Sequence, residues 1–549
     1  MRMGSKQICL AALVTVGLGS ILAGCHQSDH QTASETLSTA QIKKNLQPTM
    51  SQTRVKRDNR LADGYQTQAH RKANTLASPY VKLNPYQTSP LTALVAFTTP
   101  RATQVTVKVV GTSEKTTITH TVKGYQRHHQ VGITGLAAGK ANQVTLTAKS
   151  ASGRVTTKTV TLTTKAAPKR IGQNTVKTSK PQVMALGKGN DQLTFAVSSL
   201  GLTYGLDTAG NVRWYSSRPI AHVFKVLKNH HLLVLYQSKN GKYNTLVETD
   251  YYGRIYREYD FKGVFPTRKD PHKTSANTVI HHDAIELPDG NLMLTVDDGG
   301  SKYVEDTMIE LNRRTGKIMR VIDLKKIFPA SAYTTYTATK RADGKVDWFH
   351  QNTIYFDNRR QQLLVSGRNQ STVLALDWKT MKIKWIFGSH QGWPKKYQKY
   401  LLKQVGTPFS WNGGQHAAGL IQTGQFTGNT ERLEFYNNNV TVTRGAEKTS
   451  KQYSNGAIYD INVKKMTVRQ KWTFGQSLGK ANFTNIIGSS YRLNGQNSLL
   501  NFGYCESGKR SEFVEVNRKT NQIVYAVNRT DFPTGDWTYR AERLPIYLD

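Results

Sequence analysis

Histidine and arginine are the residues whose types and spacing most favour chemistry in this chain. Three segments place histidine near the expected start of a strand; they are Ile280–Leu287 with His281 and His282, Asp347–Ile354 with His350, and Gly413–Gly419 with His416. Arg368 follows the second segment, at the end of an apolar run. Taken alone, a histidine beside apolar residues is more often structural than functional. Their equivalent positions in successive segments favour a shared site.

Two kinds of site fit this set of side chains. Three neutral imidazoles are the ligand set of an open catalytic zinc site. A guanidinium in the same pocket would repel a metal cation, whereas its fork of N–H donors suits a tetrahedral oxyanion. The combination of histidines with Arg368 therefore predicts a site for a sulfate or phosphate group, with no metal ion.

A weak repeat indicates which elements bring these segments together. Six segments share a strand that ends at Asp or Asn, a short turn, and a second strand; they are 206–214, 249–255, 311–318, 376–385, 461–468 and 516–524. In each, Asp or Asn can hydrogen-bond to its own turn, and Gly or Asn tolerates a positive φ. Each segment is therefore predicted to be a β-hairpin.

These hairpins predict an all-β architecture. Several are preceded by a further turn and a short apolar strand, as in Pro288–Leu294 and Asn494–Leu500, which makes about four strands per unit. We expect residues 169–549 to form a six-bladed β-propeller, whose inner strands would bring the histidines to one central channel. The long spacing between the fourth and fifth hairpins leaves seven or eight blades open, and unrelated hairpins are the plainer alternative.

The first residues have the pattern of a lipoprotein signal peptide, which we assign to residues 1–24. Two basic residues precede an apolar run from Ile8 to Ala23, which ends in Leu22-Ala23-Gly24-Cys25. Small residues before Cys25 leave room for a lipoprotein signal peptidase and provide a thiol for acylation. An ordinary secretory signal that contains Cys25 is the alternative. We expect an extracytoplasmic protein, lipid-anchored at Cys25 to the bacterial cell membrane.

Loss of Cys9 with the signal and lipidation of Cys25 would leave Cys505 as the single free thiol, so no internal disulfide is expected. Residues 25–78 are rich in polar residues without sustained apolar periodicity, and they predict a flexible tether. Residues 79–168 contain alternating runs of β-branched and polar residues. This pattern predicts a small β-sandwich domain.

The chain is strongly basic. It contains 75 Lys and Arg against 36 Asp and Glu, for a formal charge of +39. Outside a membrane, such a charge attracts anionic lipid head groups or anionic cell-envelope polymers. Basic residues that serve solubility alone are the alternative. Nucleic acid is not an expected partner of an exported protein.

Beyond these patterns, the sequence resembles the bacterial arylsulfate sulfotransferases that use no nucleotide donor. The matching motifs are Asn84-Pro85-Tyr86, His282-Asp283 before Leu287-Pro288-Asp289-Gly290-Asn291, Asp347-Trp348 with His350 and Asn352, Arg368, Gln415-His416, and Tyr539-Arg540-Ala541-Glu542-Arg543. The resemblance implies transfer of a sulfuryl group from an aryl sulfate to a phenol by a ping-pong mechanism. It implies no cofactor.

The resemblance also implies a role for each matched residue. His416 would be the nucleophile that becomes sulfohistidine. Three side chains would surround the donor's sulfate and the phenolic oxygen; they are His350, His282 and Arg368. Asn352 would be a supporting donor. His281 competes with its neighbour for the inward position, because alternation along a strand lets only one of them point there.

Two other classes of protein compete with this interpretation. Hairpins rich in Asp, Gly and Trp also occur in the propellers of quinone-dependent dehydrogenases, which would need a stacking face of Trp and carboxylates for calcium. A non-catalytic propeller that binds polymers or proteins is the second rival. The sequence leaves a monomer and a homodimer both open.

Overall fold

The computed structural model describes residues 36–238, 241–266, 274–276, 278–300, 302–334, 339–341, 343–421 and 428–548. The signal peptide predicted for residues 1–24 and the lipidation site at Cys25 lie outside these ranges. Within them, no helix combines the length and the apolar character needed to cross a bilayer. Strands dominate the described chain, so the prediction of an all-β protein is confirmed.

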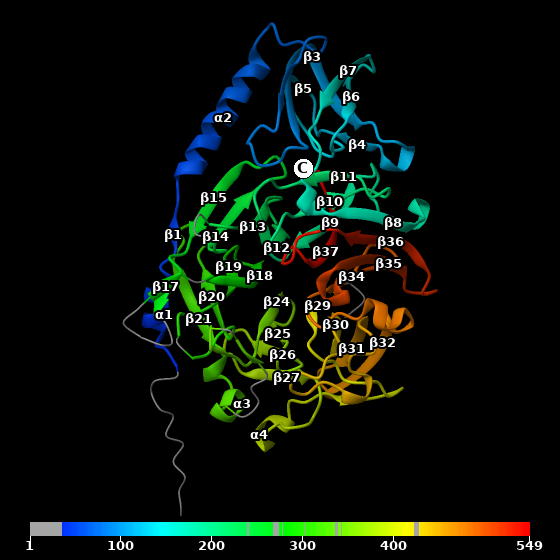
Figure 1. The fold of residues 1–549 in the computed structure, drawn as a ribbon. Coiled ribbons are helices and arrows are strands. Elements are labelled where there is room, and N and C mark those ends of the chain that lie inside the picture. Colours follow the sequence, from blue (N-terminus) through cyan, green and yellow to red (C-terminus); the bar gives the residue numbers. More distant parts are fainter. Residues whose placement is uncertain are drawn as a thin grey trace, which may run out of the picture.

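Six sheets make up the larger part of the molecule (Figure 1), and their strands pair antiparallel except for the short edge strand β28, which is parallel to β32. Five are built from consecutive strands; they are β12–β15 (Ile220–Val226, Leu232–Tyr236, Thr245–Thr249, Ile255–Asp260), β18–β21 (Ile280–Glu286, Leu292–Val296, Thr307–Leu311, Ile318–Asp323), β24–β27 (Gln351–Asp357, Gln362–Gly367, Thr372–Asp377, Ile383–Phe387), β29–β32 (His416–Leu420, Thr430–Asn437, Asn455–Asn462, Thr467–Phe474) and β33–β36 (Ser489–Arg492, Asn497–Cys505, Arg510–Asn517, Ile523–Thr530).

The sixth sheet joins the two ends of this region. It combines β9–β11 (Gln192–Ser198, Tyr204–Leu206, Val212–Tyr215) with the last strand, β37 (Thr538–Pro545), which pairs with β9. Neighbouring first strands contact one another: β12 lies against β18, β18 against β24, and β24 against β29. In Figure 1 these strands gather around one central region. The six-bladed propeller remains a prediction.

Short elements complete the sheets and their connections. Single edge strands extend three sheets, namely β1 (Thr49–Met50) on β15, β28 (Lys403–Gln404) on β32 and β8 (Gln173–Ser179) on β36. Two small pairs are β16 (Val264–Pro266) with β17 (Thr274–Ala276), and β22 (Thr339–Lys340) with β23 (Val346–Asp347). Two short helices are α3 (Ala330–Thr334) and α4 (Lys395–Gln398).

All six hairpins predicted from the repeat are present, and each joins the last two strands of a sheet or of the β9–β11 run. Their turns use the predicted local chemistry. Asp250 Oδ1, for example, accepts hydrogen bonds from the backbone N–H of Tyr252 and of Arg254, at 2.9 and 3.0 Å. Gly253 between them has a φ of +91°. The repeat was therefore a reliable signal, because each turn is stabilised within a few residues.

A smaller β-domain precedes the six sheets. Its strands are β2 (Tyr80–Leu83), β3 (Ala93–Val109), β4 (Ile118–Thr121), β5 (Gln126–Ile133), β6 (Ala141–Ser150) and β7 (Val155–Thr163). The long strand β3 pairs with β2 and β5 in its first half and with β4 and β6 in its second. Burial alternates along β6, as the sequence pattern predicted.

The structure differs from the flexible tether predicted for residues 25–78. The described part contains α1 (Thr39–Leu46) and α2 (Thr53–His70), which runs along the outside from the six sheets to the smaller domain (Figure 1). Asp58, Ala62, Tyr65 and Ala69 are buried at helical spacing along α2. The Tyr65 hydroxyl donates to Pro85 O at 2.7 Å. The polar composition of this segment concealed the buried stripe, because the stripe contains few large aliphatic residues.

Candidate active site

Five strands around the central region begin with an irregularity. The register of pairing shifts within each, between Ile220 and Phe224 in β12, Ile280 and Ala284 in β18, Gln351 and Thr353 in β24, His416 and Gly419 in β29, and Thr538 and Arg540 in β37. Such breaks re-aim side chains, and they are common beside functional sites. All the predicted histidines lie at or directly beside these breaks.

The breaks bring residues from distant parts of the chain together. The ring centroids of His282 and His350 are 4.4 Å apart. The ring centroid of Tyr539 lies 5.9 Å from that of His282 and 6.3 Å from that of His416. Arg368 is close enough to affect the ionisation of His416, and its backbone N–H donates to His350 O at 3.1 Å. The four residues predicted as catalytic therefore lie in one cluster.

His416 is buried and neutral. The residue is 2% exposed. Its Nδ1 is 2.6 Å from Asn438 Oδ1 and 3.1 Å from Gly414 O. Burial lowers the pKa of His416 well below its usual value, and the positive charges of Arg368 and His350 lower it further. Near neutral pH, one ring nitrogen of His416 therefore carries a lone pair.

His350 has the opposite environment. Its Nδ1 lies 2.5 Å from Asp347 Oδ2 and 2.6 Å from Glu305 Oε2. Burial alone would lower the pKa of His350, but the two carboxylates outweigh burial and raise the pKa to about 9. Arg341 Nη1 donates to the other oxygen of Glu305 at 2.7 Å. His350 is therefore an imidazolium at neutral pH.

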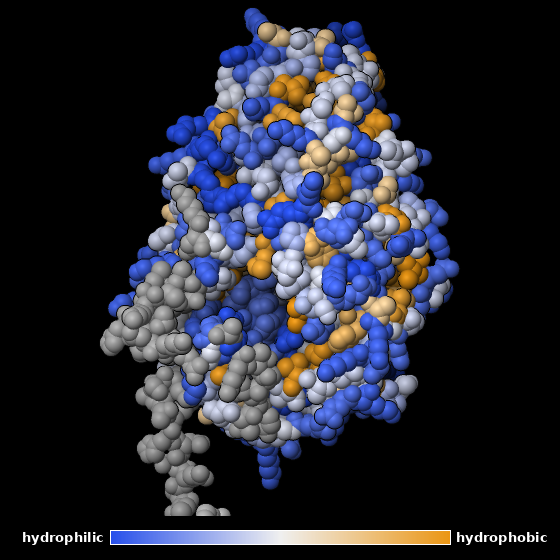
Figure 2. Space-filling view, viewed as in Figure 1, coloured by the Kyte–Doolittle hydropathy of each residue, from blue (hydrophilic) through white to orange (hydrophobic). Residues whose placement is uncertain are grey.

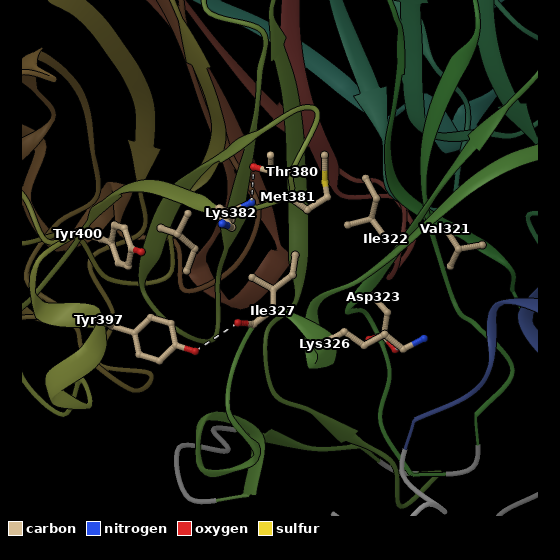
Figure 3. Close-up of a pocket in the computed structure, with 11 residues that line it drawn as sticks. Val321, Ile322, Asp323, Lys326, Ile327, Thr380, Met381, Lys382, Tyr397 and Tyr400 are labelled. Carbon is tan, nitrogen blue, oxygen red and sulfur yellow. Dashed lines mark hydrogen bonds and ion pairs between the residues drawn. The ribbon is translucent and has the colours of Figure 1, made fainter.

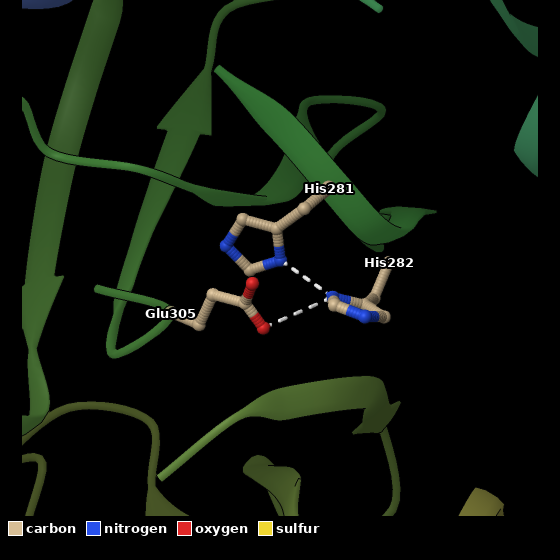
Figure 4. A group of neighbouring side chains, drawn as sticks. All are labelled: His281, His282 and Glu305. Carbon is tan, nitrogen blue, oxygen red and sulfur yellow. Dashed lines mark hydrogen bonds and ion pairs between the residues drawn. The ribbon is translucent and has the colours of Figure 1, made fainter. Parts of the chain in front are cut away.

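The tandem pair His281 and His282 also lies in the cluster (Figure 4). Their Nδ1 atoms are 2.9 Å apart, and His282 Nδ1 lies 3.6 Å from Glu305 Oε2. Strict alternation would have sent one ring away, but the register break in β18 lets both rings approach Glu305. His282 is the one that also reaches His350 and Tyr539. Burial lowers the pKa of His282 well below the usual value, and lowers that of His281 to about 4.

Two overlapping groups of side chains have the donor types of a metal site. They are His281, His282 and Glu305, and Glu305, Asp347 and His350; within each group the possible ligand atoms lie within 4.8 Å of one another. The carboxylate of Glu305 is already matched by Arg341 and by His350. Glu305 is therefore paired with two basic side chains in this structure.

Arg368 presents an unused donor at the cluster. Its Nη1 donates to Asn369 Oδ1 at 2.6 Å and its Nη2 to Asn485 O at 3.1 Å. Within the described chain, its buried Nε has no hydrogen-bond partner. A buried N–H without a partner is costly, so this atom favours an anionic ligand beside it. Asn352, predicted as a further donor to the ligand, donates from Nδ2 to Gln415 O at 2.7 Å and so anchors the residue before His416.

Three further side chains of the cluster had no role predicted from the sequence, namely His222, Glu305 and Tyr539. His222 stacks on His282 with ring centroids 5.3 Å apart and lies 4.3 Å from Tyr539. Its signal was its position, since it follows Ile220 by two residues, as His282 follows Ile280. Glu305 had no local signal. Tyr539 precedes Arg540, whose Nη1 donates to Asp283 Oδ1 at 2.9 Å and ties β37 to β18.

Figure 2 shows a hollow with hydrophilic walls near the centre of this view of the molecule. A separate pocket of about 430 Å³ lies between β21 and the β26–β27 hairpin (Figure 3). There the Tyr397 hydroxyl donates to Ile327 O at 3.2 Å. None of the described residues that line this pocket is a histidine or an arginine, so this pocket is separate from the histidine cluster.

Two family models match the chain. The model of the family described as arylsulfotransferase (ASST) matches residues 178–540, and that of the arylsulfotransferase Ig-like domain matches residues 80–165. The second match identifies the smaller β-domain as Ig-like.

Two curated relatives carry the name arylsulfate sulfotransferase AssT. The protein of Escherichia coli O6:H1 is 24% identical over 66% of this chain and 68% of its own length. That of Lelliottia amnigena is 24% identical over 61% of this chain and 61% of its own length. Among solved structures, the periplasmic gluconolactonase PpgL of Pseudomonas aeruginosa has a TM-score of 0.32 at 10% identity, with 81% of this chain and 100% of that chain covered.

Proposed function

Because the chain belongs to the arylsulfotransferase family, we propose that it transfers a sulfuryl group from an aryl sulfate ester to a phenolic acceptor. The proposed route is ping-pong, through a sulfohistidine on His416, without a nucleotide sulfate donor or another cofactor. The observation that carries this proposal is the pairing of a neutral, buried His416 with two neighbouring cations, Arg368 and His350.

The two cations suit the charge of the reaction. In the transition state, the transferred sulfuryl group spreads negative charge over its oxygens. A site stabilises this state by fixed hydrogen-bond donors and by alignment of the nucleophile with the leaving group. Arg368 offers its unpartnered Nε to those oxygens. His282 lies within ring contact of His350 and can bind the same sulfate or the phenolic oxygen.

In the first half-reaction, the lone pair of His416 attacks the sulfur of the aryl sulfate. An S–N bond forms, the S–O bond to the aryl group breaks, and its electron pair leaves with the phenolic oxygen. A phenol has a pKa of about 10, so the leaving oxygen can take the proton of His350 or leave as phenolate. The products are sulfohistidine and the first phenol.

In the second half-reaction, a new phenol reverses these steps. Its proton passes to the neutral His350, its oxygen attacks sulfur, and the S–N bond breaks to return neutral His416. Alkyl alcohols should be poor acceptors, because their hydroxyl protons are far less acidic than those of phenols.

We further propose that the six sheets are the blades of a six-bladed β-propeller. Support comes from the succession of four-stranded antiparallel sheets, the contacts between their first strands, and the union of β37 with β9–β11. In such a fold the terminal strands close a ring, so the last strand brings Tyr539 and Arg540 to residues from earlier blades.

The cellular setting is part of the proposal. Cleavage before Cys25 and its lipidation would hold the enzyme on the outer side of the bacterial cell membrane. The formal charge of +39 supports contact with anionic lipid head groups or envelope polymers. The proposed substrates are small aryl sulfates and phenols, and a homodimer is compatible with this scheme.

Intact mass spectrometry tests the mechanism. Purified protein mixed with a chromogenic aryl sulfate and no acceptor should gain one sulfuryl group, on the peptide that contains His416. Addition of a phenol should remove the group and give the sulfated phenol. The His416→Asn variant is the control and should gain none. A protein that neither gains the group nor releases the coloured phenol would instead fit a non-catalytic binding propeller.

A further inference from the structure

We propose that Asn438 is a positioning residue that holds the proton of His416 on Nδ1 and so presents Nε2 as the nucleophile. This inference rests on the proposed function, in which His416 attacks sulfur. It adds which nitrogen attacks, and which side chain decides it.

The contacts of His416 identify the nitrogen that carries hydrogen. Nδ1 faces two oxygen atoms, Asn438 Oδ1 at 2.6 Å and Gly414 O at 3.1 Å. A backbone carbonyl can only accept a hydrogen bond, so Nδ1 must donate. In a neutral imidazole the other nitrogen, Nε2, then holds the lone pair.

The orientation of the Asn438 amide is itself determined by its neighbours. Its Nδ2 donates to Thr484 O at 2.9 Å and to Ile487 O at 2.8 Å. Both N–H groups therefore point at carbonyl oxygens. A flipped amide would turn Oδ1 toward those two oxygens and its N–H groups toward His416, at the cost of two hydrogen bonds in a residue with no exposed surface.

The chain places this amide independently of His416. Asn438 directly follows β30, which pairs with β29 at His416 and Tyr436. The backbone carbonyl of Asn438 accepts from the Ser454 hydroxyl at 3.1 Å. Asn438 therefore bridges the strand of the nucleophile and the segment 484–487, which precedes β33.

A neutral hydrogen-bond partner suits His416, because its ring nitrogen must attack sulfur in the first half-reaction and leave it in the second. Sulfohistidine with hydrogen on Nδ1 has a positively charged ring. A carboxylate at position 438 would stabilise that charge and so make the S–N bond slower to break. An amide fixes the ring and its proton without this stabilisation, so both half-reactions can proceed.

The tautomer can be measured without turnover. Selective ¹⁵N labelling of histidine, with His416 assigned by its absence in His416→Asn, should show a protonated Nδ1 and an unprotonated Nε2 near pH 7.5. A resting His416 that carries its proton on Nε2, or that is doubly protonated, would overturn the proposal. This result does not depend on whether sulfohistidine forms, so it separates this inference from the proposed function.

Two variants test the choice of an amide. In Asn438→Asp, removal of the sulfuryl group by phenol should slow by about 10- to 100-fold, as for a hydrogen bond to a charged group, while adduct formation slows by less than about threefold. In Asn438→Ala only Gly414 O remains as an acceptor at Nδ1, so the Nε2-protonated tautomer should appear beside the original one, and both half-reactions should slow. The matched control is Asn521→Asp, because Asn521 lies on a remote turn and accepts from Trp472 Nε1. Equal slowing of both half-reactions in Asn438→Asp, with an unchanged tautomer in Asn438→Ala, would contradict the proposal.

Discussion

The starts of strands β24 and β29 present the same residue type in opposite charge states. His350, before β24, meets two carboxylates and has a pKa of about 9. His416, at the start of β29, meets an amide and a backbone carbonyl, and its pKa lies well below the usual value. Burial alone would make both residues neutral.

The difference shows that burial sets the charge state of His416, whereas two carboxylates override burial at His350. Carboxylates keep a proton on His350, which makes it an electrostatic and acidic group. Burial and the charges of Arg368 and His350 keep His416 neutral, and the amide of Asn438 orients its ring, as the proposed nucleophile requires. The two states also support each other, because the charges of Arg368 and His350 disfavour a proton on His416.

Removal of the Arg368 charge should have the largest effect on this comparison. Arg368→Ala should cost about 2 to 4 kcal/mol of transition-state stabilisation, judged from losses of single oxyanion donors. It should also raise the pKa of His416, so the acidic limb of the rate profile should move to higher pH. Steady-state kinetics with a chromogenic aryl sulfate between about pH 5 and pH 9 measures both effects.

Arg368→Lys is the matched control for the Arg368→Ala variant. It keeps the positive charge and loses the fork of donors, so the rate should fall while the acidic limb stays in place. A loss below about tenfold in Arg368→Ala would place Arg368 outside contact with the sulfate.

Neutralisation of Glu305 should have the next largest effect. Glu305→Gln removes one of the two carboxylates that hold the proton on His350, so the pKa of His350 should fall and the alkaline limb of kcat/KM should move to lower pH. The rate near pH 7.5 should fall about 10- to 100-fold, as expected for loss of a charged hydrogen bond. An alkaline limb that stays in place would exclude His350 as its source.

Glu310→Gln offers a matched control for the Glu305 variant. Glu310 is also largely buried, but it lies on β20 and accepts from Asn291 Nδ2, away from the histidine cluster. The same change of charge there should leave the pH profile in place. A common shift in both variants would indicate a general effect of net charge.

Local patterns in the sequence predicted much of this site. The six hairpins were predictable because each turn is stabilised by an Asp or Asn within a few residues. His282, His350 and His416 were identified by their equivalent positions near strand starts, and Arg368 by its position at the end of an apolar run. His222 shares that position and could have been found in the same way.

The charge states of the histidines were beyond the sequence. Glu305 lies between β19 and β20, far in sequence from His350, and has a φ of +57° that no local pattern indicates. Asn438 is the second of three consecutive asparagines, and only the fold separates its role from theirs. Register breaks were equally hidden, so the expectation that alternation would separate His281 from His282 failed.

The smallest expected effect is on the free energy of unfolding, which reports the proton of His350 independently of catalysis. Its pKa in the folded state, about 9, lies above the usual 6.5, so the folded protein holds this proton more tightly than the unfolded chain. The resulting stabilisation is full below about pH 6.5 and is lost as the pH rises through about 9. A shift of this size corresponds to about 3 kcal/mol in total, at about 1.4 kcal/mol per pKa unit, and about 1 kcal/mol of it is lost between about pH 8 and pH 9.5.

Urea unfolding of the wild type and of His350→Gln measures this difference. Between about pH 8 and pH 9.5 the wild type should lose about 1 kcal/mol more than the variant, because glutamine has no proton to release. The subtraction removes the contribution of lysines and tyrosines that titrate in the same range, since both proteins contain them. Equal losses would mean that the carboxylates do not hold the proton, and the contrast between His350 and His416 would then disappear.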